Sequence, residues 1–162
     1  MKRFFVTAIA CLGFAAFTNA QDISENAIGL RLGDSDGFGA EISYQRALGG
    51  DNNRLELDLG WRSGSSFDGF KLTGVYQWVW NLDGNFNWYA GAGGGVGSYS
   101  FDNLPPGADD SETFFFLAGN VGIEYNFDIP LQLSLDARPE LGFGDFRDDL
   151  DFDIALGIRY RW

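Results

Sequence analysis

The sequence predicts an all-β protein: an eight-stranded antiparallel up-and-down β-barrel that spans a membrane and has a polar lumen filled by side chains. Three observations predict it. Segments that alternate between apolar and polar residues cover most of the 162 residues, aromatic residues reach 17 % beside 23 glycines, and the N-terminus has the character of an export signal. Aromatic and Gly content at this level, in segments of period two, is typical of strands and turns rather than helices.

The last segment shows the alternation most clearly. In a β-strand, successive side chains point to opposite faces, so residues of one parity share a face. One face of the segment from Asp151 to Trp162 is apolar, with Phe152, Ile154, Leu156, Ile158, Tyr160 and Trp162. The other face is charged or small, with Asp151, Asp153, Ala155, Gly157, Arg159 and Arg161.

The first twenty residues predict a signal peptide. Lys2 and Arg3 precede an apolar run over 4–17, which is short for a membrane-spanning helix, and small residues lead up to Ala20. We expect cleavage after Ala20, so that residues 1–20 are the signal peptide and 21–162 the barrel. The alternative is a lipoprotein that is cleaved before Cys11. Cys11 is the single cysteine, so the chain cannot form an internal disulfide.

The rest of the chain divides into seven further strands separated by turn residues. The eight predicted strands are 27–33, 38–48, 54–62, 70–82, 86–101, 112–127, 131–143 and 151–162. Pro139 lacks a backbone N–H, so we expect it to interrupt the hydrogen-bond ladder and to mark a bulge or a distortion near the end of the seventh strand. The connections after the second, fourth and sixth strands are short, those after the third, fifth and seventh are longer, and the short first connection is an exception.

Alternation alone does not separate a soluble barrel from a membrane barrel, which reverses the polar and apolar faces. The polar faces here combine arginines with carboxylates, and Lys71 is the one lysine after residue 20. An arginine fork can satisfy several acceptors in a desolvated interior. We therefore expect a lumen charge network, with a structural salt-bridge role, made of Arg31, Glu41, Arg54, Glu56, Asp58, Arg62, Asp136, Arg138, Glu140, Arg159 and Arg161.

Aromatic residues gather near the strand ends that the short connections join. This distribution is typical of the belts that membrane barrels place at the bilayer interface. The predicted aromatic girdle contains Trp78, Trp80, Trp88, Tyr125, Tyr160 and Trp162.

The terminal strand, with its ending Tyr160-Arg161-Trp162, resembles that of the small eight-stranded outer-membrane proteins of Gram-negative bacteria, the OmpX type and the transmembrane domain of OmpA. The resemblance covers the chain after residue 20, and Trp162 departs from the Phe that usually ends the family. It implies an integral outer-membrane protein without enzymatic activity. It also implies lipid and lipopolysaccharide as surroundings, and a C-terminal strand read by the barrel-assembly machinery. The Ala20-Gln21 junction is similar to signal-peptide ends in Bacteroidota.

Gly91, Gly93, Gly95 and Gly97 share one parity. A phosphate-binding loop would need a strand-turn-helix context, which the sequence does not offer. Inward glycines instead leave room in a narrow lumen, and Phe114 or Phe116 of the next strand would fill that room unless a bulge turns them outward.

The predicted outer loops are acidic, and carboxylates are the ligands that Ca²⁺ and Mg²⁺ prefer. The weak metal candidates are Asp34, Asp36, Asp109, Asp110, Asp148 and Asp149; Asp68, Asp102 and Asp145 lie in the same loops. Asp34-Ser35-Asp36 begins like a calcium loop, but Phe38 and Gln45 break the EF-hand pattern. The alternatives are a solvated acidic rim, which we favour, and a divalent cation that bridges the rim to lipopolysaccharide phosphates.

The chain has no histidine, the usual base of membrane-barrel hydrolases and acyltransferases, so we expect no enzyme and no cofactor. The net charge of −12 argues against nucleic acid as a partner. A structural or surface-interaction barrel is the first hypothesis. The alternatives are a narrow channel for ions or small solutes, a barrel subunit of an envelope complex, and a secreted lipocalin-like carrier.

Overall fold

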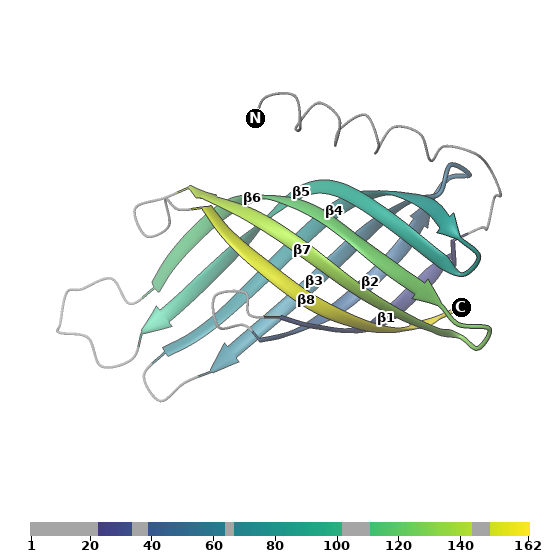
Figure 1. Cartoon of the computed structure of the whole chain (residues 1–162). Coiled ribbons are helices and arrows are strands. Elements are labelled where there is room, and N and C mark those ends of the chain that lie inside the picture. Colours follow the sequence, from purple (N-terminus) through teal and green to yellow (C-terminus); the bar gives the residue numbers. More distant parts are fainter. Residues whose placement is uncertain (1–22, 34–38, 64–66, 102–110, 144–149) are drawn as a thin grey trace, which may run out of the picture.

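The computed structural model describes residues 23–33, 39–63, 67–101, 111–143 and 150–162, and these form one closed antiparallel barrel (Figure 1). Its strands follow the order of the chain, each paired with the next. They are β1 (Asn26–Leu32), β2 (Ala40–Leu48), β3 (Asn53–Ser63), β4 (Phe67–Asp83), β5 (Phe86–Phe101), β6 (Ser111–Asn126), β7 (Leu131–Phe143) and β8 (Leu150–Arg161). The predicted fold class is confirmed.

The barrel closes where β8 pairs with β1. Leu32 lies opposite Leu156 and Ala27 opposite Arg161. Two backbone hydrogen bonds between Asn26 and Trp162, of 3.1 and 3.0 Å, extend this pairing of β8 with β1 to the last residue. The C-terminus therefore lies at the same end as the tight connections between β2 and β3, β4 and β5, and β6 and β7 (Figure 1).

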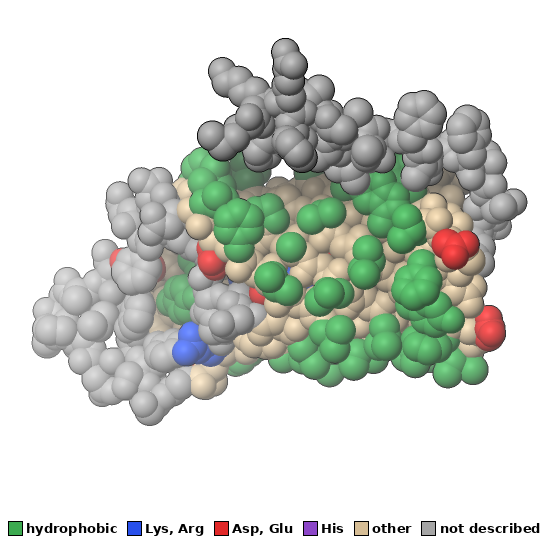
Figure 2. All heavy atoms as spheres, in the orientation of Figure 1, with side chains coloured by type: hydrophobic (Ala, Val, Ile, Leu, Met, Phe, Trp, Pro, Cys, Tyr) green, Lys and Arg blue, Asp and Glu red, His purple; other side chains and the backbone are tan. Residues whose placement is uncertain are grey.

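Most apolar side chains of the strands lie outside the barrel, and the charged side chains of the strand interiors lie inside it. In β8, Ile154 and Ile158 are 66 % and 42 % exposed, whereas Asp153 and Arg159 are 2 % and 1 % exposed. Hydrophobic side chains are spread along the face shown in Figure 2, with backbone visible between them, and the few prominent charged ones lie toward its ends. This is the reverse of a soluble barrel and the arrangement expected of a transmembrane one.

Two sequence expectations need correction. At Pro139 the expected interruption of the ladder is confirmed, but the expected bulge is absent: the pairing of β6 with β7 stops at Ala118–Glu140 and resumes at Val121–Ala137 in the same register. A Cβ on Gly119 would lie only 3.1 Å from the ring of Pro139, so the glycine makes room for the ring. Asp68 belongs to β4 rather than to a loop, because β4 begins at Phe67, where Asp68 pairs with Ser63 and Ser100.

The glycines of β5 make room for aromatic side chains from β6. A Cβ on Gly95 would lie 2.4 Å from the ring of Phe116, and one on Gly97 would lie 2.3 Å from the ring of Phe114. Both rings are 3 % exposed and pack with Val75 and Ala118. Packing of Phe114 and Phe116 into the lumen is therefore confirmed, and the register of β5 with β6 is continuous through this stretch.

Among the described residues, no helix is long and apolar enough to cross a membrane. The predicted signal peptide, including its cleavage position and the alternative at Cys11, lies outside the described residues. The same holds for the loop carboxylates Asp34, Asp36, Asp102, Asp109, Asp110, Asp145, Asp148 and Asp149.

Candidate functional site: the charged lumen

The lumen contains twelve charged side chains among the described residues, none more than 3 % exposed. They come from every strand except β5, because the polar parity of each strand points inward. The cations are Arg31, Arg54, Lys71, Arg138 and Arg159, and the carboxylates are Glu41, Glu56, Asp58, Glu124, Asp136, Glu140 and Asp153. Charges buried in this way require partners, so the arrangement of the pairs determines whether the barrel is stable.

Two arginines from opposite ends of the sequence meet at Glu41 of β2. Arg31 of β1 donates to Glu41 at 2.9 Å and to Asp136 of β7 at 2.7 Å, and it contacts Asp153 of β8 as well. Arg138 of β7 reaches the same oxygen of Glu41 at 3.4 Å. These contacts join residues as far as 122 positions apart across the barrel.

Arg138 continues the network to β3, where its guanidinium donates to Glu56 at 3.1 Å and to Asp58. Arg159 of β8 donates to the second carboxylate oxygen of Glu56 at 3.1 Å. Gln45 donates to Glu56 at 2.5 Å. Glu56 is therefore held by two arginines and an amide, whereas the contacts of Asp58 are fewer.

Two further ion pairs lie on either side of this centre. Arg54 and Glu124 meet at 2.7 Å, and the guanidinium of Arg54 lies over the ring of Tyr89 at 4.8 Å. Lys71 donates to both oxygens of Glu140 at 2.7 Å and lies 5.0 Å from the ring of Phe116.

Neutral amides join the Arg54 pair to the centre. Gln77 accepts from Arg54 at 2.6 Å and donates to Asn120 at 2.7 Å, and Asn120 donates to Asp136 at 3.2 Å.

The structure places nine of the eleven residues of the expected network in the buried lumen. The other two lie at the barrel ends. Arg161 is half-buried and donates to the carbonyl of Phe127 at 2.7 Å. Arg62 departs from the expectation: it is exposed, because it lies near the end of β3, beyond the last pair of β3 with β2 at Gly60 and Glu41.

Three charged members of the network were absent from the expected set: Lys71, Glu124 and Asp153. Each belongs to the polar parity of its strand, so the alternation that identified the others also identifies these. Tyr89 is inward and fully buried, and it lies over Gly122, where an added Cβ would be 2.6 Å from the ring. The sequence signal for this contact was a glycine in the inward parity of β6.

Each residue of the expected girdle lies on the outer surface at the end with the tight turns. Trp80 and Trp88 stack with ring centroids 4.4 Å apart, and Tyr160 and Trp162 stack at 6.0 Å. A second aromatic belt, which the sequence analysis did not predict, lies at the other end of the barrel. Its outward aromatic residues are Trp61, Phe70, Phe115, Phe143 and Phe152. Two belts with aliphatic residues between them match the two interfaces of a bilayer.

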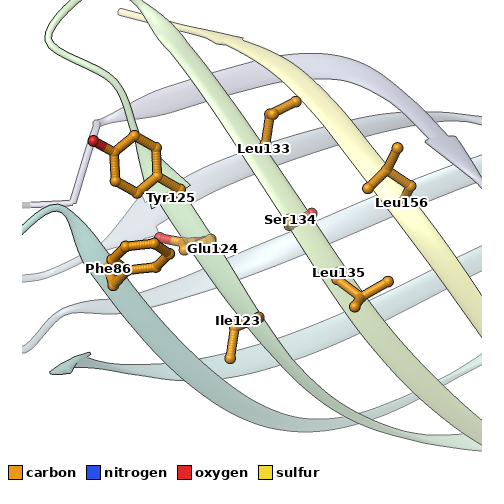
Figure 3. Close-up of a pocket in the computed structure, with 8 residues that line it drawn as sticks. All are labelled: Phe86, Ile123, Glu124, Tyr125, Leu133, Ser134, Leu135 and Leu156. Carbon is orange, nitrogen blue, oxygen red and sulfur yellow. The ribbon is translucent and has the colours of Figure 1, made fainter. Parts of the chain in front are cut away.

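A shallow groove of about 160 Å³ lies on the outer surface over β5–β8 (Figure 3). Phe86 and Tyr125 form one end of it, and Leu133, Leu135 and Leu156 line the rest. The exposed lining is almost wholly apolar, because the side chains of Glu124 and Ser134 are buried on the lumen side of their strands, so the groove suits an acyl chain. Within the described ranges, no cluster of His, Cys, Asp or Glu is arranged to hold a metal ion.

Comparison with solved structures gives the fold a context. The barrel is similar to Neisserial surface protein A, with a TM-score of 0.56 and 16 % identity over 85 % of this chain and 94 % of that one. It is similar to the N-terminal β-barrel domain of Pseudomonas aeruginosa OprF, with a TM-score of 0.64 and 14 % identity over 86 % and 98 %. For Ail, the attachment invasion locus protein of Yersinia pestis, the TM-score is 0.56 with 21 % identity over 86 % and 97 %.

The chain has the fold of the small outer-membrane β-barrels. No family model matches it, and no curated protein matches it in sequence. The agreement in fold therefore rests on the strand pattern and the closed topology, at sequence identities too low to transfer a site or a ligand.

Proposed function

We propose that this chain is an integral outer-membrane protein with a structural or surface-interaction role and no enzymatic activity. The observation that carries the proposal is the reversed polarity of the barrel. Its outer surface is aliphatic between two aromatic belts, and its lumen is occupied by paired charges. Residues 1–20 would export the chain, and the bilayer would then solvate the outer surface.

A barrel of this kind acts through its rims, because the lumen is inaccessible. One of the similar proteins is named a surface protein and another an attachment invasion locus protein, which supports a role at the cell surface. The acidic segments between β1 and β2, β3 and β4, β5 and β6, and β7 and β8 would face outward, where a divalent cation can bridge carboxylates to lipopolysaccharide phosphates. The terminal strand, which closes the barrel at Trp162, would be the segment that the assembly machinery reads.

The charges of the lumen support a structural role better than a conduction role. Every charged side chain of the central network is paired and nearly unexposed, and Phe114 and Phe116 fill the lumen beside Lys71 and Glu140. An eight-stranded barrel is just wide enough for its side chains to fill it.

Fractionation combined with gel mobility tests the proposal. Cells expressing the full chain are fractionated, and the outer-membrane fraction is run with and without boiling. We expect the protein in that fraction, with a band that shifts on heating as the folded barrel unfolds. A protein found in the soluble fraction would overturn the membrane assignment. Steady single-channel conductance of the purified barrel in a planar bilayer would replace the structural role by a channel.

A further inference from the structure

The described lumen has more carboxylates than cations, with seven carboxylates against five cations. A carboxylate left unpaired in a desolvated interior costs more free energy than taking up a proton, so such groups neutralise. The excess of carboxylates means that at least one carboxyl group of the described network has no cation of its own.

Two guanidinium groups each face three carboxylates. Arg31 faces Glu41, Asp136 and Asp153, and it contacts Asp136 through two nitrogens. Arg138 faces Glu41, Glu56 and Asp58. Glu41 also has Arg31 at 2.9 Å, and Glu56 also has Arg159 at 3.1 Å and the amide of Gln45.

Asp58 has a single cationic partner among the described ion pairs, and it shares the donating nitrogen of that partner, Nη2 of Arg138, with Glu56. Its side chain is fully buried, and its Oδ1 has no hydrogen-bond partner among the described groups.

Among the described ion pairs, no cation other than Arg138 pairs with Asp58. The largest charge effects on it come from Glu56 on its own strand, Glu41 of β2, Arg138 of β7 and Arg159 of β8, and Arg159 pairs with Glu56 instead. Its neighbour across the pairing with β4 is Thr73, whose buried hydroxyl likewise has no partner in the described residues. Lys71, two residues along β4 from Thr73, is held by both oxygens of Glu140.

We propose that Asp58 binds a proton in the folded barrel, so that the centre of the lumen is a proton-binding site at neutral pH. The proton comes from water as the chain folds, forms an O–H bond on the Asp58 carboxyl, and leaves Arg138 to neutralise Glu41 and Glu56. In the unfolded chain an aspartate has lost its proton above about pH 4. Folding then takes up a proton, so the folding constant falls about tenfold for each pH unit of increase while the site keeps its proton.

Asp58→Asn tests the proposal, with Glu56→Gln as its control because it makes the same change two residues away on the same strand. Infrared spectra of the barrel in lipid vesicles at pH 7 should contain a carboxylic-acid C=O band, and the band should be lost in Asp58→Asn. The folding constant of Asp58→Asn should remain within about threefold of the wild type at pH 7 and lose the tenfold slope with pH. Glu56→Gln should lower the folding constant by about a hundredfold or more, because two arginines lose a shared carboxylate.

Absence of the band from the wild type, persistence of the band in Asp58→Asn, or a loss of stability in Asp58→Asn equal to that of Glu56→Gln would each overturn the proposal. If Asp58→Asn does not fold, wild-type protein containing carboxyl-¹³C-aspartate replaces it. The band must then shift to lower frequency, and a band that stays in place refutes protonation of an aspartate.

Discussion

The inner and outer walls of the barrel are built from the same strands, yet different forces act on them. The inner wall joins distant strands through directed contacts, such as those of Arg138 with Glu41, Glu56 and Asp58. The outer wall consists of side chains such as Leu117, 58 % exposed, whose partner in the proposed membrane is lipid. Inward positions therefore depend on the identity of particular partners, whereas outward positions depend on hydrophobicity alone.

This difference indicates which positions of the barrel tolerate substitution. Removing one buried charge leaves several others unpaired, since the inner contacts share members. Removing part of an outward aliphatic side chain exchanges one apolar contact with lipid for another. Mutations on the two walls should thus differ in their cost even when they are adjacent in sequence, and the following substitutions measure that difference.

The largest effect should come from Arg138→Ala on the inner wall. It leaves Glu41 and Glu56 competing for the remaining arginines and removes the hydrogen-bond donor to Asp58. We expect a loss of about 3–5 kcal/mol in the free energy of unfolding. Urea titration in lipid vesicles, followed by tryptophan fluorescence, measures it. A loss below about 1 kcal/mol would show that the inner contacts are interchangeable.

Val121→Arg should have the next largest effect, on the outer wall. Val121 is 49 % exposed and lies opposite Ala90 and Ala137, away from both aromatic belts. A charge facing lipid at this depth costs about 2–4 kcal/mol. The same titration checks the value, and Ile129→Arg, in the exposed turn between β6 and β7, serves as its matched control with little expected change. Equal stabilities for the two variants would contradict a lipid-facing wall at Val121.

Phe116→Leu and Phe115→Leu compare the two walls at neighbouring positions. Phe116 is 3 % exposed and packs onto Gly95, whereas Phe115 is 61 % exposed. We expect Phe116→Leu to lose about 1 kcal/mol, because a change of shape in a packed interior leaves an imperfect fit. Phe115→Leu should change the stability by less, and the opposite ranking in parallel unfolding curves would reverse the assignment of faces in β6.

The smallest effect should come from Arg46→Ala at the rim. Arg46 pairs with Glu25 at 2.9 Å, but the two side chains are 46 % and 68 % exposed. Exposed pairs contribute about 0–1 kcal/mol, because water already solvates both charges. The unfolding curve of Arg46→Ala should therefore lie close to that of the wild type, and a loss comparable to that of Arg138→Ala would remove the distinction between rim and lumen.

The sequence by itself determined the number of strands, their approximate bounds and, for most residues, the face on which they lie. Alternation is a local property of the extended backbone, so it can be read one segment at a time, as in β8. Lys71, Glu124 and Asp153 carried the same signal in their strands. The choice of a membrane barrel over a soluble one also followed from the residues, because arginines and carboxylates share the polar face.

Only the tertiary structure decided which charged side chains pair with one another. Arg31 contacts Asp136 across 105 positions of sequence, and Gly122 accepts the ring of Tyr89 from the neighbouring strand. The same structure placed Arg62 beyond the lumen and kept the register at Pro139. These outcomes depend on the tilt and stagger with which eight strands close into a barrel, and that geometry is a property of all the strands together. A single strand specifies which face a side chain takes, but not the height and angle at which it meets its partner across the lumen.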